Sequence, residues 1–156
     1  MNTQSRSRRY KLPQVRIHMV KEGKSLYSDC PFSSPSVVYE VLAKAMRGLD
    51  RETVVCVVLD TRLNPLNFTV VSVGGINMAY VQAANVFKTA LLSNGASVIL
   101  AHNHPSGVPE PSTEDIELTK KIVAAGKVMY IPVLDHIICG DGSYLSLKET
   151  HQSIFD

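Results

Sequence analysis

Two histidines one residue apart are the residues of this chain best suited to chemistry. His102 and His104 follow residues 97–101, an apolar run that predicts a buried strand. Side chains alternate along an extended chain, so positions 102 and 104 project from the same face. Asp115 lies one short loop further on. Two imidazoles and a carboxylate can bind one divalent metal, and zinc in catalytic sites takes three such ligands and leaves a fourth position for water.

Each of these residues also has a simpler interpretation. A lone His-x-His pair often belongs to surface or hydrogen-bonded histidines. Ser112 and Asp115 have the Ser-x-x-Asp spacing of a helix capping box, in which Ser112 is the N-cap. His136, in an apolar strand, is interpreted as a core histidine or the support of a ligand. The metal interpretation depends on the whole series of strand, His-x-His-Pro, Gly- and Pro-rich loop, Ser-x-x-Asp and helix.

A hydrolytic metal site also needs a carboxylate that takes a proton from water and hands it to the leaving group. Glu52, at the edge of a strand predicted over residues 53–59, is one candidate. The others are Glu110, Glu114 and Glu117, on the loop and the helix that follow the histidines. The residues alone favour Glu52 but leave the other three open.

Strands and helices alternate along the rest of the chain. A half-exposed strand is predicted over residues 14–20, from its alternating apolar residues. Pro35 is expected to begin a helix that Gly48 ends. The further elements are strands at 53–59, 68–73, 97–101, 131–139 and 144–147, and helices at 81–92 and 113–125. Helices on some connections and tight turns on others predict a mixed sheet covered on both faces, an α/β sandwich.

The length of 156 residues suits one domain. We expect a basic, loosely ordered tail at residues 1–12, a strand and loop at 13–33, the domain with the candidate metal site at 34–149 and a C-terminal tail at 150–156. The tail is either simply solvated or a contact for phosphates or an acidic partner. Three scattered cysteines argue against disulfides and favour a reducing compartment. With no leader-like or membrane-spanning apolar run, a cytoplasmic protein without membrane contact is expected.

The combined motifs resemble a known family. Glu52 ahead of a strand, with the His-x-His-Pro and Ser-x-x-Asp motifs, resembles the JAMM metalloprotease motif of MPN+ domains. The resemblance is closer to the bacterial RadC-type JAB domain and covers roughly residues 34–149. It is carried by the segments 101–107, 111–115, 118–119 and 134–138.

The resemblance implies a three-layer α/β/α sandwich of the cytidine-deaminase-like, MPN/JAB type, with one Zn²⁺ per chain. His102, His104 and Asp115 would ligate the metal. Glu52 would activate the water, and Ser112 would help to stabilise the tetrahedral oxyanion. The implied activity is zinc-dependent hydrolysis of a peptide or isopeptide bond in an unknown peptide or protein substrate.

Two departures from the family pattern limit what is carried over. Longer members have an N-terminal helix-hairpin-helix region, for which this chain has no room, so an inherited DNA-binding role is weakened. The family's usual His-Pro-Arg-Glu appears here as residues 82–85, Gln-Ala-Ala-Asn.

Other functions remain in competition with the hydrolase. RadC-type proteins are traditionally described as DNA repair proteins, and the basic tail is the residue-level support for a nucleic-acid partner. A zinc deaminase would need His-x-Glu and Pro-Cys-x-x-Cys, and the chain has neither. A non-catalytic, metal-binding scaffold is the third alternative. The sequence indicates neither the oligomeric state nor the role of residues 82–85.

Overall fold

A single mixed sheet of five strands organises the chain. The computed structural model describes residues 12–23, 26, 28–74 and 81–156. The strands lie in the order β2-β1-β3-β4-β5. β1 pairs antiparallel with β2 and β3, β3 pairs parallel with β4, and β4 pairs antiparallel with β5. Their bounds are β1 Thr53–Leu59, β2 Pro65–Val73, β3 Ser97–Asn103, β4 Val133–Cys139 and β5 Tyr144–Ser146.

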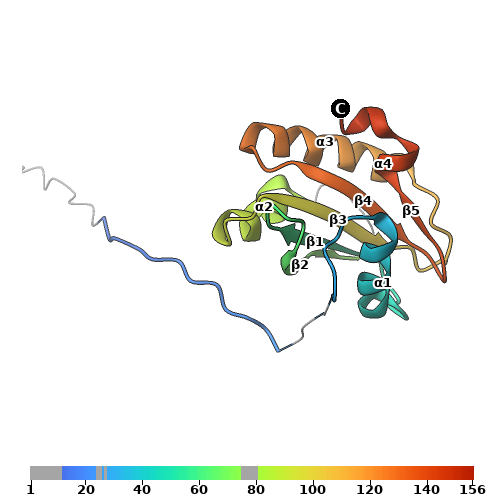
Figure 1. Cartoon of the computed structure of the whole chain (residues 1–156), viewed down its shortest axis with the longest axis horizontal. Coiled ribbons are helices and arrows are strands. Elements are labelled where there is room, and N and C mark those ends of the chain that lie inside the picture. The colour runs from blue at the N-terminus through green and yellow to red at the C-terminus, as the bar shows by residue number, and fades with distance from the viewer. Residues whose placement is uncertain (1–11, 24–25, 27, 75–80) are drawn as a thin grey trace, which may run out of the picture.

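Helices cover both faces of the sheet, which confirms the predicted three-layer α/β/α sandwich (Figure 1). α1 lies on one face, and α2, α3 and α4 lie on the other. Successive residues of β1 alternate between the two cores: Val54 and Cys56 pack with α2 and α3, Val55 and Val57 with α1. The helices are α1 Pro35–Met46, α2 Ala83–Leu92, α3 Thr113–Met129 and α4 Leu147–Thr150, followed by the 3₁₀ helix η1 Gln152–Ile154.

Local sequence signals explain where the helices next to the candidate site begin and end. α1 starts with proline at its first position, and Gly48, with φ of 76°, lies just beyond its end. α3 begins at a complete capping box made by Ser112 and Asp115. It continues beyond the predicted end at residue 125 and stops at Tyr130, whose φ is 56°.

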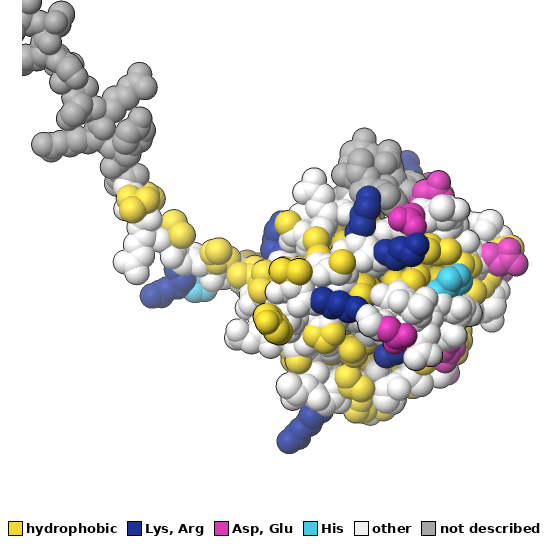
Figure 2. All heavy atoms as spheres, turned by 90° about the horizontal axis from the view of Figure 1, so that it is seen from above, with side chains coloured by type: hydrophobic (Ala, Val, Ile, Leu, Met, Phe, Trp, Pro, Cys, Tyr) yellow, Lys and Arg dark blue, Asp and Glu magenta, His cyan; other side chains and the backbone are white. Residues whose placement is uncertain are grey.

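The strand predicted over residues 14–20 is wrong. Residues 12–22 are extended but unpaired, and they lead away from the body of the molecule (Figures 1 and 2). Their apolar side chains, among them Val15, Ile17 and Val20, are exposed. Alternation supplies an apolar face, but a strand also needs a partner for its N–H and C=O groups. None of the described strands provides one.

Two further segments differ from the sequence prediction. β2 begins at Pro65 rather than 68, because the Asp60 carboxylate accepts the N–H groups of Arg62 and Asn64 and closes a shorter turn. Residues 150–156, predicted as a tail, contain the end of α4 and η1, and Ile154 and Phe155 pack on the core beside α3. Among the described residues, no helix combines the length and apolar character that crossing a bilayer requires.

Candidate metal centre

His102, His104 and Asp115 meet at one point between β3 and α3. The Nε2 atoms of the two histidines are 2.9 Å apart. His102 Nε2 lies 3.3 Å from Asp115 Oδ1, and His104 Nε2 lies 3.5 Å from Asp115 Oδ2. His102 and Asp115 are fully buried, and the His104 side chain is 13 % exposed. The group therefore has one accessible side, at His104.

Strand pairing and the helix start hold these residues together. His102 is paired with Val54 of β1 and Ile138 of β4, so the end of β3 is fixed from both sides. The His104 N–H donates to Cys139 O at 2.9 Å, which extends that support to the second histidine. Asp115 is held in the first turn of α3 by the capping box. A buried strand end and the first turn of a helix, in which Asp115 is buried, thus converge without a flexible arm.

The two oxygens of Asp115 have different surroundings. Oδ2 accepts hydrogen bonds from Ser112 N and Ser112 Oγ, both at 2.7 Å. Oδ1 is buried and has no hydrogen-bond partner among the residues that the structure describes. A buried carboxylate oxygen without a partner is costly. The capping box and a metal site are therefore compatible, because Ser112 binds Oδ2 and leaves Oδ1 available to a metal ion.

A chain of hydrogen bonds fixes which nitrogen of His102 carries the proton. Thr119 Oγ1 donates to the Asp115 carbonyl at 2.6 Å, since a carbonyl can only accept. His136 Nδ1, 2.6 Å from Thr119 Oγ1, must then be the donor to that hydroxyl. His136 Nε2 is left to accept from His102 Nδ1, at 2.8 Å. The Nε2 atom of His102 consequently faces Asp115 and His104 with a free lone pair.

The same logic applies to His104. Its Nδ1 lies 2.8 Å from the Val108 carbonyl and therefore donates to it. In the neutral ring Nε2 is then unprotonated. Burial, with a smaller contribution from His104, lowers the pKa of His102 to about 3. Burial also lowers the pKa of His136 well below its usual value. The contact of 3.3 Å between His102 and Asp115 is therefore not an ion pair.

These observations fit a bound zinc ion. The lone pair of His102 Nε2, the Nε2 atom of His104 and an unpartnered carboxylate oxygen converge in a largely buried space, an arrangement that favours a cation between them. A tetrahedral ion with bonds of about 2.0–2.1 Å keeps its ligands about 3.3 Å apart. The distance of 2.9 Å between the two Nε2 atoms and that of 3.3 Å from His102 Nε2 to Asp115 Oδ1 are close to that spacing, and His104 Nε2 lies 3.5 Å from the other oxygen, Oδ2. The donor set of two imidazoles and one carboxylate is one that zinc prefers.

The hydrogen-bond chain makes a specific prediction for Thr119. Thr119→Val keeps the shape of the side chain but removes the acceptor of the His136 Nδ1–H, so the direction of the chain is no longer fixed. Partners that orient a ligating histidine contribute about 10- to 100-fold to metal affinity. We expect zinc affinity, measured by competition with a chelating dye, to fall by about that factor.

Thr89→Val is the matched control for this substitution. Thr89 Oγ1 is also buried, but it has no hydrogen-bond partner and lies on α2. Replacing it should leave zinc affinity unchanged. Equal losses in both variants would contradict an orienting role for Thr119.

Glu52 lies just before β1, and Ser112 is the N-cap of α3. Glu52, half-buried, directly precedes β1, and its carbonyl accepts from Gly74 N at 2.9 Å. The antiparallel pairing of Val54 with His102, continued by two residues, brings Glu52 opposite His104. The Ser112 hydroxyl, at the exposed start of α3, donates to Asp115 Oδ2. Its role towards an oxyanion stays a prediction.

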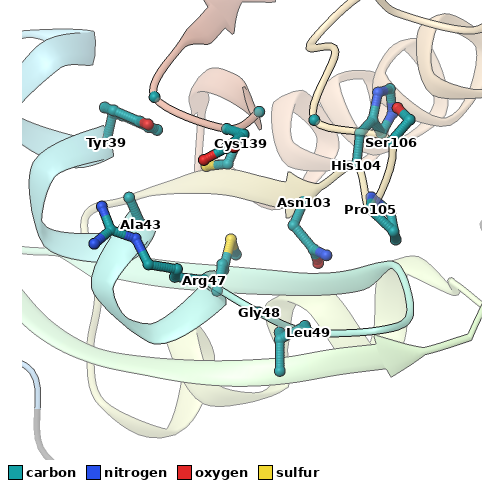
Figure 3. A pocket seen from close by; sticks show the side chains of 15 residues that line it. Tyr39, Ala43, Arg47, Gly48, Leu49, Asn103, His104, Pro105, Ser106 and Cys139 are labelled. Carbon is teal, nitrogen blue, oxygen red and sulfur yellow. The ribbon is translucent and has the colours of Figure 1, made fainter.

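A recess of about 400 Å³ adjoins the centre (Figure 3). Its lining includes Tyr39 of α1 and Arg47 just after it, Asn103 at the end of β3 and His104 just after it, and the turn at 140–142. His102 and Asp115 do not line it. The recess therefore touches the metal candidates only through His104, on their accessible side.

The three residues that converge were predicted from the sequence, but two residues around them, Thr119 and Asn103, were not. Thr119 lies four positions after Asp115, on the same helix face, and that spacing was a usable signal. Asn103 lies between the two histidines and points to the opposite face of the sheet, where its amide holds the segment around Glu52. Its contacts depend on residues some 50 positions away, for which the local sequence gives no signal.

Comparison with known proteins agrees with this geometry. The family model of the RadC-like JAB domain matches residues 32–152. A UPF0758 protein of Methanosarcina mazei is 49% identical over 117 residues, 75% of this chain and 51% of the relative. UPF0758 proteins of Methanococcoides burtonii and Chloroflexus aurantiacus are 46% and 44% identical, over 80% and 76% of this chain and 56% and 52% of the relatives. The chain thus spans about half the length of the curated relatives it matches.

Proposed function

Because the chain belongs to the RadC-like JAB domain family, we propose that it is a zinc-dependent hydrolase of peptide or isopeptide bonds. The observation that carries the proposal is the bare Oδ1 atom of Asp115, buried close to the Nε2 atoms of His102 and His104. A scaffold that only needed to be stable would gain from a partner at this oxygen. Cation binding explains why it has none.

His102, His104 and Asp115 would hold the ion. When bound, zinc supplies Lewis-acid polarisation of a carbonyl and lowers the pKa of water to about 7. Glu52 would take the proton from the attacking water and deliver it to the leaving nitrogen, the role of a general base and acid. Burial of His102 and Asp115 excludes bulk solvent from the inner side of the centre, so the reacting groups would approach from the side of His104.

Ser112 would assist at the oxyanion. In the present arrangement its hydroxyl proton is donated to Asp115 Oδ2, at 2.7 Å. Rotation of the hydroxyl would redirect that proton, while Ser112 N would continue to hold Asp115 Oδ2. The substrate chain would lie in the recess beside His104, where Tyr39 and Arg47 are available for contacts.

Metal removal tests the proposal directly. The purified chain is stripped with a chelator, reloaded with zinc, and assayed on a quenched-fluorescent peptide library and on a peptide bearing a lysine isopeptide bond. We expect one zinc per chain, cleavage of at least one probe by the loaded protein, and no cleavage after stripping. Cleavage that survives stripping, or loaded protein that cleaves neither probe, would count against the hydrolase.

The DNA-linked alternative has less support among the described residues. The basic residues of its tail, Arg6, Arg8, Arg9 and Lys11, lie outside the described part of the chain. On the face seen in Figure 2, Lys and Arg side chains are scattered among apolar and acidic ones rather than gathered into a patch. Phosphate binding by a folded surface normally uses clustered positive charge. The metal centre therefore favours the hydrolase.

A further inference from the structure

Asn103 lies between the two histidines, but its side chain serves a different part of the molecule. Residues 102 and 104 face α3, and position 103 therefore faces the α1 side of the sheet. Asn103 is 5 % exposed. Its Oδ1 accepts from Thr53 N at 2.8 Å, and its Nδ2 donates to Arg51 O at 3.0 Å. The amide thus binds the two peptide groups on either side of Glu52.

We infer that Asn103 is a positioning residue, which holds the backbone of Glu52 in register with the two histidines. The inference rests on the proposed function, because it concerns Glu52 as the proton-transfer group. It assigns to the middle residue of the His-x-His pair a task separate from metal binding.

The contacts around Glu52 form a complete backbone clamp. Asn103 fixes the peptide groups before and after the residue, and the Glu52 carbonyl accepts from Gly74 N at 2.9 Å. The regular pairing of β1 with β3 ends at Val54 and His102, one step before this point. The side-chain amide of Asn103 therefore takes the place of the next backbone hydrogen bonds between β1 and β3. Without it, the segment that carries Glu52 would lose its contact with β3 and would be held only by its pairing with β2.

Residues 102–104 therefore position two parts of the candidate centre, the metal ligands and the segment that carries Glu52. His102 and His104 fix the metal position on one face, and Asn103 fixes the start of β1 from the other. A displacement of the carboxylate by about 1 Å is enough to cost about 100-fold in rate. The metal ligands keep their own supports, the chain through His136 and the Val108 carbonyl.

The test combines amide exchange, zinc affinity and kinetics for Asn103→Ala and the isosteric Asn103→Asp, in case the former folds poorly. Asn103→Ala should lose exchange protection at the Thr53 amide, while amides in the centre of β1 keep theirs. Asn103→Asp keeps an oxygen that can accept from Thr53 N, but it removes the amide N–H that donates to Arg51 O. In both variants zinc affinity should change less than threefold, and kcat should fall about 10- to 100-fold with KM nearly unchanged.

Asp60→Ala is the matched control. Asp60 also binds two backbone N–H groups, of Arg62 and Asn64, but at the opposite end of β1. It should lower stability without lowering kcat. A role through Glu52 further requires that the double variant Asn103→Ala/Glu52→Gln is no slower than Glu52→Gln alone.

The outcomes separate this inference from the proposed function. Unchanged Thr53 protection, or unchanged kcat in Asn103→Ala while Glu52→Gln is inactive, overturns the inference and leaves the hydrolase intact. If the wild-type protein cleaves neither peptide probe, the proposed function fails, and the exchange measurement still decides whether the clamp exists. A further drop in the double variant would show that Asn103 acts elsewhere and would also overturn the inference.

Discussion

Glu52→Gln should bind one zinc per chain and yet hydrolyse substrate about 10²- to 10⁴-fold more slowly than the wild type. That range is the usual contribution of a positioned general acid–base group. The substitution keeps size and polarity and removes only the ability to take up a proton. Zinc binding should persist because Glu52 is not one of the three residues whose donor atoms converge. The measurements are kcat on the cleaved probe and metal content after gel filtration.

Glu114→Gln is the informative control. Glu114 is an exposed acid in the first turn of α3, next to Asp115, and the sequence left it open as a candidate base. Its substitution should leave kcat within about twofold, as is usual for a surface change. Full activity of Glu52→Gln, or equal losses in both variants, would contradict the assignment of Glu52.

The convergence of the three candidate metal ligands could be predicted because each position depends on local geometry. The alternation of a strand sets His102 and His104 on one face, and the capping motif sets Asp115 in the first turn of a helix. The short loop between them limits their separation. The structure brings the three together, with all the donor atoms within 4.8 Å of one another. Local rules therefore suffice for this part of the site.

The supports of the site could not be predicted in the same way. His136 was interpreted as a core histidine or a support, and it is both buried and hydrogen-bonded to His102. Its contact depends on β4 lying parallel to β3, which no local pattern specifies. Asn103 contacts the start of β1 for a similar reason, since that contact follows from the antiparallel pairing of distant strands.

The same distinction explains the errors in the fold. Strand β1, almost entirely apolar and buried at every position, was predicted with its observed bounds because a continuous apolar run of this length is typical of a strand covered on both faces. The alternating segment at 14–20 has an equally clear pattern, but a strand exists only with a partner. Sequence periodicity reports which face would be buried, and pairing decides whether burial occurs.

Asp115→Asn should change stability and metal binding in opposite directions. We expect the metal-free protein to become more stable and the stabilisation by zinc to be largely lost. Asp115 is fully buried, and its Oδ1 is unpartnered and 3.3 Å from the unprotonated Nε2 of His102. In the variant an amide N–H can donate to that nitrogen, and the remaining oxygen can keep the capping box. Relief of an unsatisfied buried group is worth about 1–3 kcal/mol. The metal-free variant should therefore melt a few degrees above the metal-free wild type.

Zinc should reverse this order. At a free zinc concentration 100 times Kd, binding stabilises the wild type by about 2.7 kcal/mol, which raises Tm by about 5–10 °C in a chain of this size. Asp115→Asn, without the charged ligand, should show little or no zinc-dependent shift. Differential scanning calorimetry with and without zinc measures both effects.

Ser112→Ala provides the comparison that distinguishes a cap from a ligand. It removes the hydroxyl that accepts from Asp115 N at 3.1 Å, so the metal-free protein should lose about 1 kcal/mol. It keeps the carboxylate, so its zinc-dependent shift in Tm should remain. If Asp115→Asn instead loses stability like Ser112→Ala and still responds to zinc, Asp115 is a helix cap and not a metal ligand. The opposite result, in which Asp115→Asn is stabilised without metal and does not respond to zinc while Ser112→Ala is destabilised and still responds, would show that the Asp115 carboxylate binds a cation at a cost to the stability of the metal-free protein.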